Sequence, residues 1–150
     1  MKTPSGPDLT QHPPRSPRVR LGGYVLLPRM LDKCRALLAG TNGEYNYSCP
    51  MDQHFLSFAG IDPEAFKAEA ATGKGDGEML AWVNAHAVNR PTPSAIAAWS
   101  AFMEKRAPCD VEGREFFQEE HRRLAPQRED VVTWFDLLDL DDYLFFGGQA

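Results

Sequence analysis

An apolar pattern with a period near 3.6 residues constrains the fold of this chain more than any other feature. It is clearest on one face of a helix expected from Leu27 to Ala39, which carries Leu27, Met30, Leu31, Cys34 and Leu38. Pro28 suits the first turn of that helix, where a missing N–H costs nothing, and Gly40 provides a stop. No β-type alternation and no internal repeat accompanies the pattern. The sequence therefore predicts an all-α protein.

Further helices are expected wherever the same spacing follows proline, aspartate or threonine. Three of them are predicted from Pro50 to Gly60, from Asp62-Pro63 to Gly73 and from Asp110 to Pro126. Three more are predicted to start at a cap at Asp76, at Thr92-Pro93 and at about Asp130. Their buried faces are expected to include Phe55, Leu56, Met79, Val83, Ile96, Phe102, Met103, Phe116, Phe117, Val131, Phe135 and the three tryptophans. The chain has 150 residues, enough for one core that needs no disulfide. We expect a compact bundle of about six or seven helices, forming a single domain over residues 1–150.

The segment HPPRSPRVRLGGY, residues 12–24, predicts an extended arm ahead of the first long helix. Pro13, Pro14 and Pro17 favour a polyproline-like path that loses little entropy on ordering. Gly22-Gly23 can turn the chain into the helix. We therefore expect residues 1–21 to pack on the body as a proline- and arginine-rich arm.

Charge is distributed unevenly along the chain. Residues 1–35 hold seven basic and two acidic side chains, whereas the remaining residues hold nine basic and nineteen acidic ones. Residues 129–142 contain six acids and no base. This polarity predicts either attraction between the two ends of the chain or recognition of a charged partner. A net charge of −5 argues against a nucleic-acid partner, and the apolar runs are too short to span a membrane.

The cysteines and histidines indicate no metal site or cofactor. Cys34, Cys49 and Cys109 are odd in number and lack CxxC spacing, so we expect reduced thiols in a cytoplasmic protein. The polar N-terminus does not resemble a secretory signal. The four histidines are scattered without HxxxH or HExxH spacing.

The first candidate site is cationic. Arg29, Asp32 and Lys33 share one helix face, and the arm can place Arg15 and Arg18 beside it. Several guanidinium groups in a small volume bind phosphate or carboxylate through paired hydrogen bonds. Alternatively, this face is simply solvated and holds one weak ion pair.

The second candidate site is the segment from Tyr45 to His54. It gathers Tyr45, Tyr47, Cys49 and Asp52 at the start of a helix. The helix N-terminus can activate a thiol, which makes Cys49 the best candidate nucleophile and Asp52 or His54 its nearest base. Alternatively, Cys49 is a buried small side chain and Asp52 complements the positive end of the helix.

The arrangement PPRSP…LGGY…LPR-LDK-R in residues 13–35, together with the later TWFDLLDLDD, resembles a family known as the domain of unknown function numbered 5069. The likeness covers nearly the whole chain. It implies a small stand-alone bacterial protein and supplies no activity.

Two functions are therefore expected to compete. One is a non-enzymatic binding module that recognises a small anion or an acidic peptide through an arginine-rich groove. The other is a small enzyme that uses the Tyr45–His54 loop with Cys49 or Asp52. The apolar YLFFGG near the C-terminus either folds back onto the body or covers a second copy, so both a monomer and a homodimer are open.

Overall fold

The structure is a computed structural model that describes residues 5–150. This part of the chain forms seven α-helices and contains no β-strand. The helices are α1 (Leu27–Ala39), α2 (Pro50–Ala59), α3 (Pro63–Ala70), α4 (Asp76–His86), α5 (Pro93–Lys105), α6 (Val111–Leu124) and α7 (Trp134–Phe145). The prediction of an all-α fold with about seven helices is confirmed.

Most helices begin and end where local signals place them. The side chains of Asp62, Thr92 and Asp110 accept the backbone N–H three residues ahead and cap α3, α5 and α6. Gly40 and Gly60 adopt left-handed backbone angles at the ends of α1 and α2.

Three predicted boundaries are wrong. The N-cap of α4 is Gly75, with Asp76 as the first helical residue. Helix α3 ends at Ala70, before Gly73. Helix α7 begins at Trp134 rather than near Asp130, because the hydroxyl of Thr133 accepts the N–H of Asp136 and sets a later cap.

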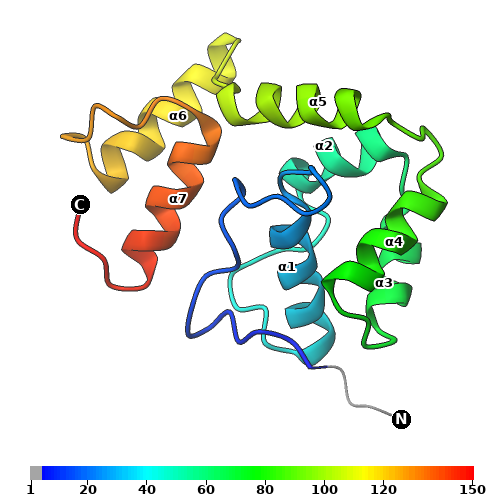
Figure 1. Ribbon diagram of the computed structural model, residues 1–150. Coiled ribbons are helices and arrows are strands. Elements are labelled where there is room, and N and C mark those ends of the chain that lie inside the picture. Colours follow the sequence, from blue (N-terminus) through cyan, green and yellow to red (C-terminus); the bar gives the residue numbers. More distant parts are fainter. Residues whose placement is uncertain (1–4) are drawn as a thin grey trace.

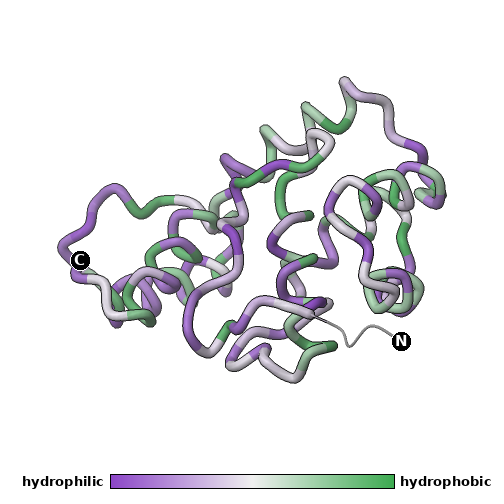
Figure 2. The backbone as a smooth tube through the Cα atoms, turned by 60° about the horizontal axis from the view of Figure 1, so that its bottom comes forward, coloured by the Kyte–Doolittle hydropathy of each residue, from purple (hydrophilic) through white to green (hydrophobic). Residues whose placement is uncertain are grey.

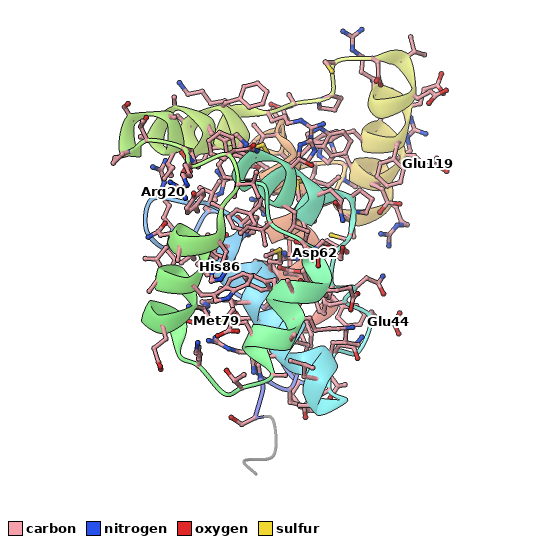
Figure 3. The ribbon with its side chains drawn as sticks, turned by 90° about the vertical axis from the view of Figure 1, so that its right-hand side faces the viewer. Arg20, Glu44, Asp62, Met79, His86 and Glu119 are labelled. Atoms are coloured by element: carbon pink, nitrogen blue, oxygen red, sulfur yellow. The ribbon has the colours of Figure 1, made fainter. Side chains whose placement is uncertain are left out.

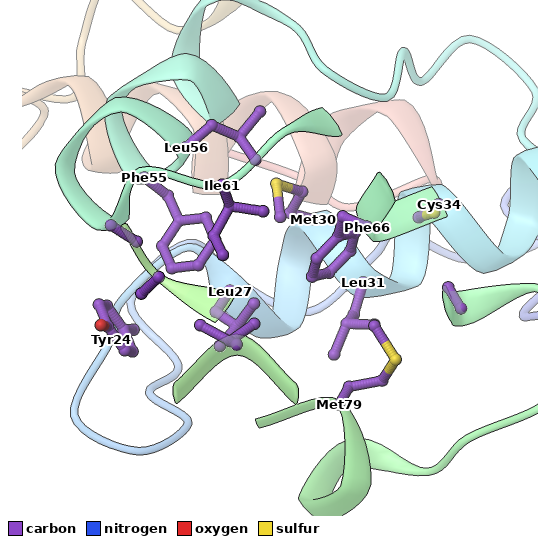
Figure 4. Close-up of a cluster of buried hydrophobic side chains, with 14 of the residues drawn as sticks. Tyr24, Leu27, Met30, Leu31, Cys34, Phe55, Leu56, Ile61, Phe66 and Met79 are labelled. Atoms are coloured by element: carbon purple, nitrogen blue, oxygen red, sulfur yellow. The ribbon is translucent and has the colours of Figure 1, made fainter. Parts of the chain in front are cut away.

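Helix α1 is at the centre of the molecule (Figure 1). Helices α3 and α4 lie on one side of it, α6 and α7 lie on the other, and α5 runs across the top between the two groups. The main core surrounds α1, where Tyr24, Phe55 and Phe66 are almost fully buried (Figure 4). Five helices, α1 to α5, contribute to this core.

The α6–α7 pair has a small core of its own. It is built from Phe117, Ala125, Val131, Leu137 and Leu140. A third cluster, formed by Val25, Leu26, Met103 and Phe135, joins α7 to the start of α1 and the end of α5. Helix α7 is therefore fixed to the body by a narrow apolar contact, and polar contacts complete the junction.

Two aromatic residues expected in the core lie outside it. Phe102 is 62% exposed and Phe116 is 57% exposed. Both residues lie on the solvent side of their helices, while Met103 and Phe117, one position later, are buried. The three tryptophans are half-buried and pack against the edges of the cores.

Residues 5–26, which precede α1, follow the surface of the body (Figure 1), and residues 1–4 of the predicted arm lie outside the described residues. The backbone N–H of Arg15 donates to Asp32 at 2.9 Å, and Leu26 donates to the Pro17 carbonyl at 3.0 Å. Gly22 and Gly23 take left-handed angles at the turn. The buried hydroxyl of Ser100 closes this turn, donating to the Gly23 carbonyl at 2.6 Å and accepting the Val25 N–H at 3.1 Å.

No helix within residues 5–150 is both long enough and apolar enough to cross a membrane. Hydrophilic and hydrophobic residues are interspersed along the helices, as Figure 2 shows.

Candidate functional site

The polar face of α1 is buried. Arg29 and Lys33 are each only 4% exposed. The alternative of a solvated face is therefore wrong, because the N-terminal arm, the loop after α1 and helix α7 cover these side chains. Two cations this deep in a protein require partners.

Arg29 is paired with Asp142 of α7. Its Nη1 lies 2.7 Å from Asp142 Oδ2, and its Nη2 lies 3.4 Å from Oδ1. The hydroxyl of Tyr45 donates to the same carboxylate at 2.7 Å, and the Tyr45 ring lies 5.6 Å from the Arg29 guanidinium. Burial, followed by the hydrogen bond to Asp142, raises the pKa of Tyr45 well above its ordinary value.

Lys33, one turn along α1, is paired with Asp52 of α2. Lys33 Nζ lies 3.0 Å and 2.9 Å from the two carboxylate oxygens of Asp52 and 3.2 Å from the sulfur of Cys49. Asp52 also accepts the N–H of Ser48 at 3.0 Å. Cys49 is the N-cap residue of α2 and is half-buried.

These two ion pairs form one wall of a cavity of about 450 Å³, named here the α1–α7 cavity. Tyr45 and Cys49 add polar groups, and Met51, Leu138 and Phe145 add apolar surface. The complete lining is Arg29, Lys33, Glu44, Tyr45, Asn46, Cys49, Met51, Asp52, Arg123, Leu138, Asp141, Asp142 and Phe145. Its volume is in the range of pockets that hold small molecules.

The exposed charges of the cavity are mixed in sign. Glu44 lies at the periphery of the molecule (Figure 3). Arg123 is half-exposed and pairs with Glu120 at 2.6 Å, while its guanidinium lies 4.0 Å from Asp141. Burial raises the pKa of Asp141, against the attraction of Arg123. Inside the cavity the charges of Arg29 and Lys33 are neutralised by buried aspartates, whereas the exposed residues at its opening carry both positive and negative charge.

The arm arginines lie outside this cavity. Arg15 binds Asp32 at 3.0 Å and Asp76 at 2.8 Å, and Asp76 also accepts from Arg35 at 2.8 Å. The hydrogen bond from Arg15, with that from Arg35, lowers the pKa of Asp76 to about 2. Asp32 and Asp76 line a separate hollow of about 420 Å³.

Arg18 faces α7 instead, where it pairs with Asp136 and, at 3.1 Å, with Asp139. The two charged ends of the chain therefore contact each other. Within residues 5–150, every buried side-chain nitrogen or oxygen has a hydrogen-bond partner.

Five of the nine predicted site residues line the α1–α7 cavity: Arg29, Lys33, Tyr45, Cys49 and Asp52. Arg15, Arg18 and Asp32 lie elsewhere, as described above. Tyr47 is part of the core, where its hydroxyl donates to the Pro63 carbonyl at 2.7 Å and its ring stacks on Phe66. His54 does not line the cavity, and burial, with Arg106 nearby, lowers its pKa.

Sequence reasoning offered attraction between the acidic C-terminal segment and the basic arm as one alternative, but it did not place α7 and α6 at this site. Asp136, Asp139 and Asp142 recur every three residues and face the arm and α1. That spacing was a usable signal, since three acids on one helical face form a side that can pair with cations of another segment. Arg123 and Leu138 carried no comparable signal, because their place at the cavity depends on how the α6–α7 pair docks.

Within residues 5–150, no group of three or more histidine, cysteine, aspartate or glutamate side chains is arranged to hold a metal ion. The model of one protein family, described as a domain of unknown function (DUF5069), matches residues 11–144. No curated protein matches the sequence. The match covers both sides of the α1–α7 cavity, from the arm to Leu144 of α7.

Proposed function

We propose, from the premise that this chain belongs to the DUF5069 family, that the protein is a non-enzymatic binding module and that its ligand occupies the α1–α7 cavity. One observation carries the proposal. Five side chains selected for their chemistry, from α1 and from residues 45–52, converge with α7 on a single cavity of small-molecule size.

The ligand that fits this lining is a small molecule with an anionic group and an apolar part. Met51, Leu138 and Phe145 would contact the apolar part. Arg29 and Lys33 in the wall and Arg123 at the opening are the cations available to the anionic group, and each already pairs with a carboxylate. The anion must therefore share their N–H donors or displace a carboxylate, so we expect modest affinity that falls as salt rises.

A small anion suits the structure better than an acidic peptide does. The cavity has room for a single small group rather than for a chain of several residues.

Binding is also favoured over the alternative of an enzyme built on Cys49 or Asp52. The polar group next to the Cys49 sulfur is the Lys33 amine, which donates a hydrogen bond to the sulfur and is paired with Asp52, so it is not placed to take the thiol proton. Asp52 is fully buried and accepts from Lys33 and Ser48. His54 lies outside the cavity, so no base is aligned with the thiol.

The proposal is tested by thermal unfolding of the full chain with hexanoate, hexylamine and hexanol at equal concentrations, and with phosphate, sulfate and nucleotides. A ligand at a hundredfold excess over its Kd stabilises by about 2.7 kcal/mol. In a protein of this size that corresponds to an increase in Tm of roughly 5–10 °C. We expect an increase with hexanoate that exceeds the effects of hexylamine and hexanol.

Paired variants locate the site. Arg123→Gln should reduce the response to hexanoate, while Arg122→Gln, one residue earlier and outside the cavity, should preserve it. In the second pair, Tyr45→Phe should likewise reduce the response to hexanoate, and the exposed control Tyr143→Phe should preserve it. A response to hexylamine alone would overturn the anion specificity, and no response to any compound would overturn the binding proposal.

We also propose that the protein acts in the bacterial cytoplasm, which the three free cysteines support. The choice between a monomer and a homodimer stays open, and light scattering of the purified chain decides it. Tyr143 and Phe145 of the YLFFGG segment, together with Phe102 and Phe116, are exposed apolar side chains available to a homodimer interface.

A further inference from the structure

Cys49 and Lys33 form a close thiol–amine contact in the wall of the α1–α7 cavity. Lys33 Nζ lies 3.2 Å from Cys49 Sγ, and it also lies 3.0 Å from Asp52 Oδ1. Lys33 lies on α1, whereas Cys49 and Asp52 lie at the start of α2, so tertiary packing holds the nitrogen next to the sulfur. Ser48, in a left-handed conformation with φ of 61°, sets the backbone direction into Cys49.

The two reacting atoms differ in their access to solvent. Lys33 is 4% exposed and Asp52 is fully buried. Cys49 is half-buried and lines the cavity, so a small solute can reach its sulfur from the cavity side. An oxidant would therefore reach the sulfur first, and the oxidised sulfur would already be in contact with an amine.

We propose that Cys49 and Lys33 are an oxidative cross-linking site that closes when a hydroperoxide reaches the cavity. In the first step the Cys49 thiol takes one oxygen from hydrogen peroxide and becomes a sulfenic acid, and one water is released. In the second step the Lys33 nitrogen attacks the sulfur, an S–N bond forms, and the sulfenic oxygen leaves as a second water.

The proton balance is met by groups that the structure places at the site. Nζ gives up its extra ammonium proton before it attacks and loses one more proton when the S–N bond forms. This second proton joins the hydroxide that leaves the sulfur and completes the second water. The Asp52 carboxylate, 3.0 Å away, is the nearest acceptor for the first of these. Sulfur is oxidised and peroxide is reduced. Sulfenic acids in proteins condense with a backbone nitrogen to give an S–N bond, and here the Lys33 amine takes the place of that nitrogen.

The other two cysteines lack this combination of access and amine. Cys34 is fully buried, and its burial raises the pKa of the thiol to about 12. Cys109 is exposed, and within residues 5–150 no hydrogen bond joins its sulfur to a lysine nitrogen. The two serve as internal controls, one shielded from oxidant and one reactive without a partner amine.

The cross-link would remove the positive charge of Lys33 and leave Asp52 buried without its cation. A buried carboxylate without a partner is costly, so the contact between α1 and α2 would loosen or Asp52 would take up a proton. The cavity wall would change with it. This inference does not depend on the identity of any ligand and stands whether or not the binding proposal holds.

The test is mass spectrometry of the full-length chain with the Cys109→Ser substitution, before and after treatment with hydrogen peroxide. We expect a product about 2 Da lighter than the reduced chain, which dithiothreitol returns to the original mass. Trypsin should fail to cleave after Lys33, and the peptides that contain Lys33 and Cys49 should appear linked. Matched variants are Lys33→Arg, which keeps a cation for Asp52, and Cys49→Ser.

Both variants should abolish the 2 Da loss, while circular dichroism and the protection of Cys34 from alkylation report that the fold is retained. The proposal would be overturned if Cys49 were oxidised to sulfinic acid while trypsin still cleaved after Lys33. The proposal would also be overturned if Cys49 stayed reduced under conditions that oxidise Cys109 in the unsubstituted chain.

Discussion

Replacement of Asp142 by asparagine should destabilise this protein more than any other single charge change on α7. Asp142 and Arg29 have side chains only 9% and 5% exposed, joined by contacts of 2.7 and 3.4 Å. Tyr45 donates to the same carboxylate at 2.7 Å. Asparagine keeps the shape of the side chain but leaves the guanidinium of Arg29 buried without a compensating charge.

The magnitude follows from burial. Breaking a buried ion pair by removing one partner costs about 3–5 kcal/mol, because the remaining charge stays desolvated. Domains of this kind are stable by only about 5–15 kcal/mol, so the loss is a large part of the total. With a urea m-value of about 2 kcal/mol per M, the unfolding midpoint should fall by roughly 1.5–2.5 M.

Urea unfolding followed by circular dichroism measures this shift, with Asp141→Asn as the neighbouring control. The side chain of Asp141 is 53% exposed, and its nearest cation, Arg123, lies 4.0 Å away. We expect that control to change stability by less than about 0.5 kcal/mol. The double variant Arg29→Met with Asp142→Leu removes both charges and should recover most of the loss. A loss below about 1 kcal/mol for Asp142→Asn would refute the reasoning, since it would mean that the pair is hydrated.

Three further predictions concern other parts of the molecule. The two arginine partners of Asp76 lower its pKa from the ordinary value of 3.8 to about 2. The ionised carboxylate therefore stabilises the fold fully above about pH 5, and this stabilisation is lost as the pH falls toward 2. In urea titrations at successive pH values, Asp76→Asn should make the loss of stability at acid pH less steep. Ser100→Ala should cost about 1–3 kcal/mol of unfolding free energy by leaving a buried N–H and a carbonyl without partners, whereas the exposed Ser57→Ala should be nearly neutral. Iodoacetamide should label Cys109 within the folded protein and Cys34 only after unfolding, and equal labelling rates measured by mass spectrometry would contradict the burial and raised pKa of Cys34.

The helices were predictable because their signals are local. Proline in the first turn, a capping side chain and a terminal glycine act on the backbone within four residues, so α1, α2, α5 and α6 begin where the sequence indicates. The start of α7 was misplaced because Asp130 and Thr133 are both good caps. Only Thr133 is followed three residues later by an acid, Asp136, whose carboxylate accepts the backbone N–H of Thr133.

Burial of individual aromatic residues was less predictable. Phe102 and Met103 are neighbours on α5, and Phe116 and Phe117 are neighbours on α6. Each pair offers two apolar residues about 100° apart on a helix, and either can face the core. The docking of the helix on its neighbours selects Met103 and Phe117 and leaves the two phenylalanines exposed.

The sequence by itself determined that this protein is helical and that its two ends carry opposite charge, since periodicity, caps and composition are properties of short stretches of chain. Only the tertiary structure decided which charges meet. Arg29 and Asp142 are 113 positions apart, and Arg15 and Asp76 are 61 apart. No local spacing encodes such pairs, because they form only when the apolar contacts of α1, α5 and α7 have brought distant segments together and excluded water from between them.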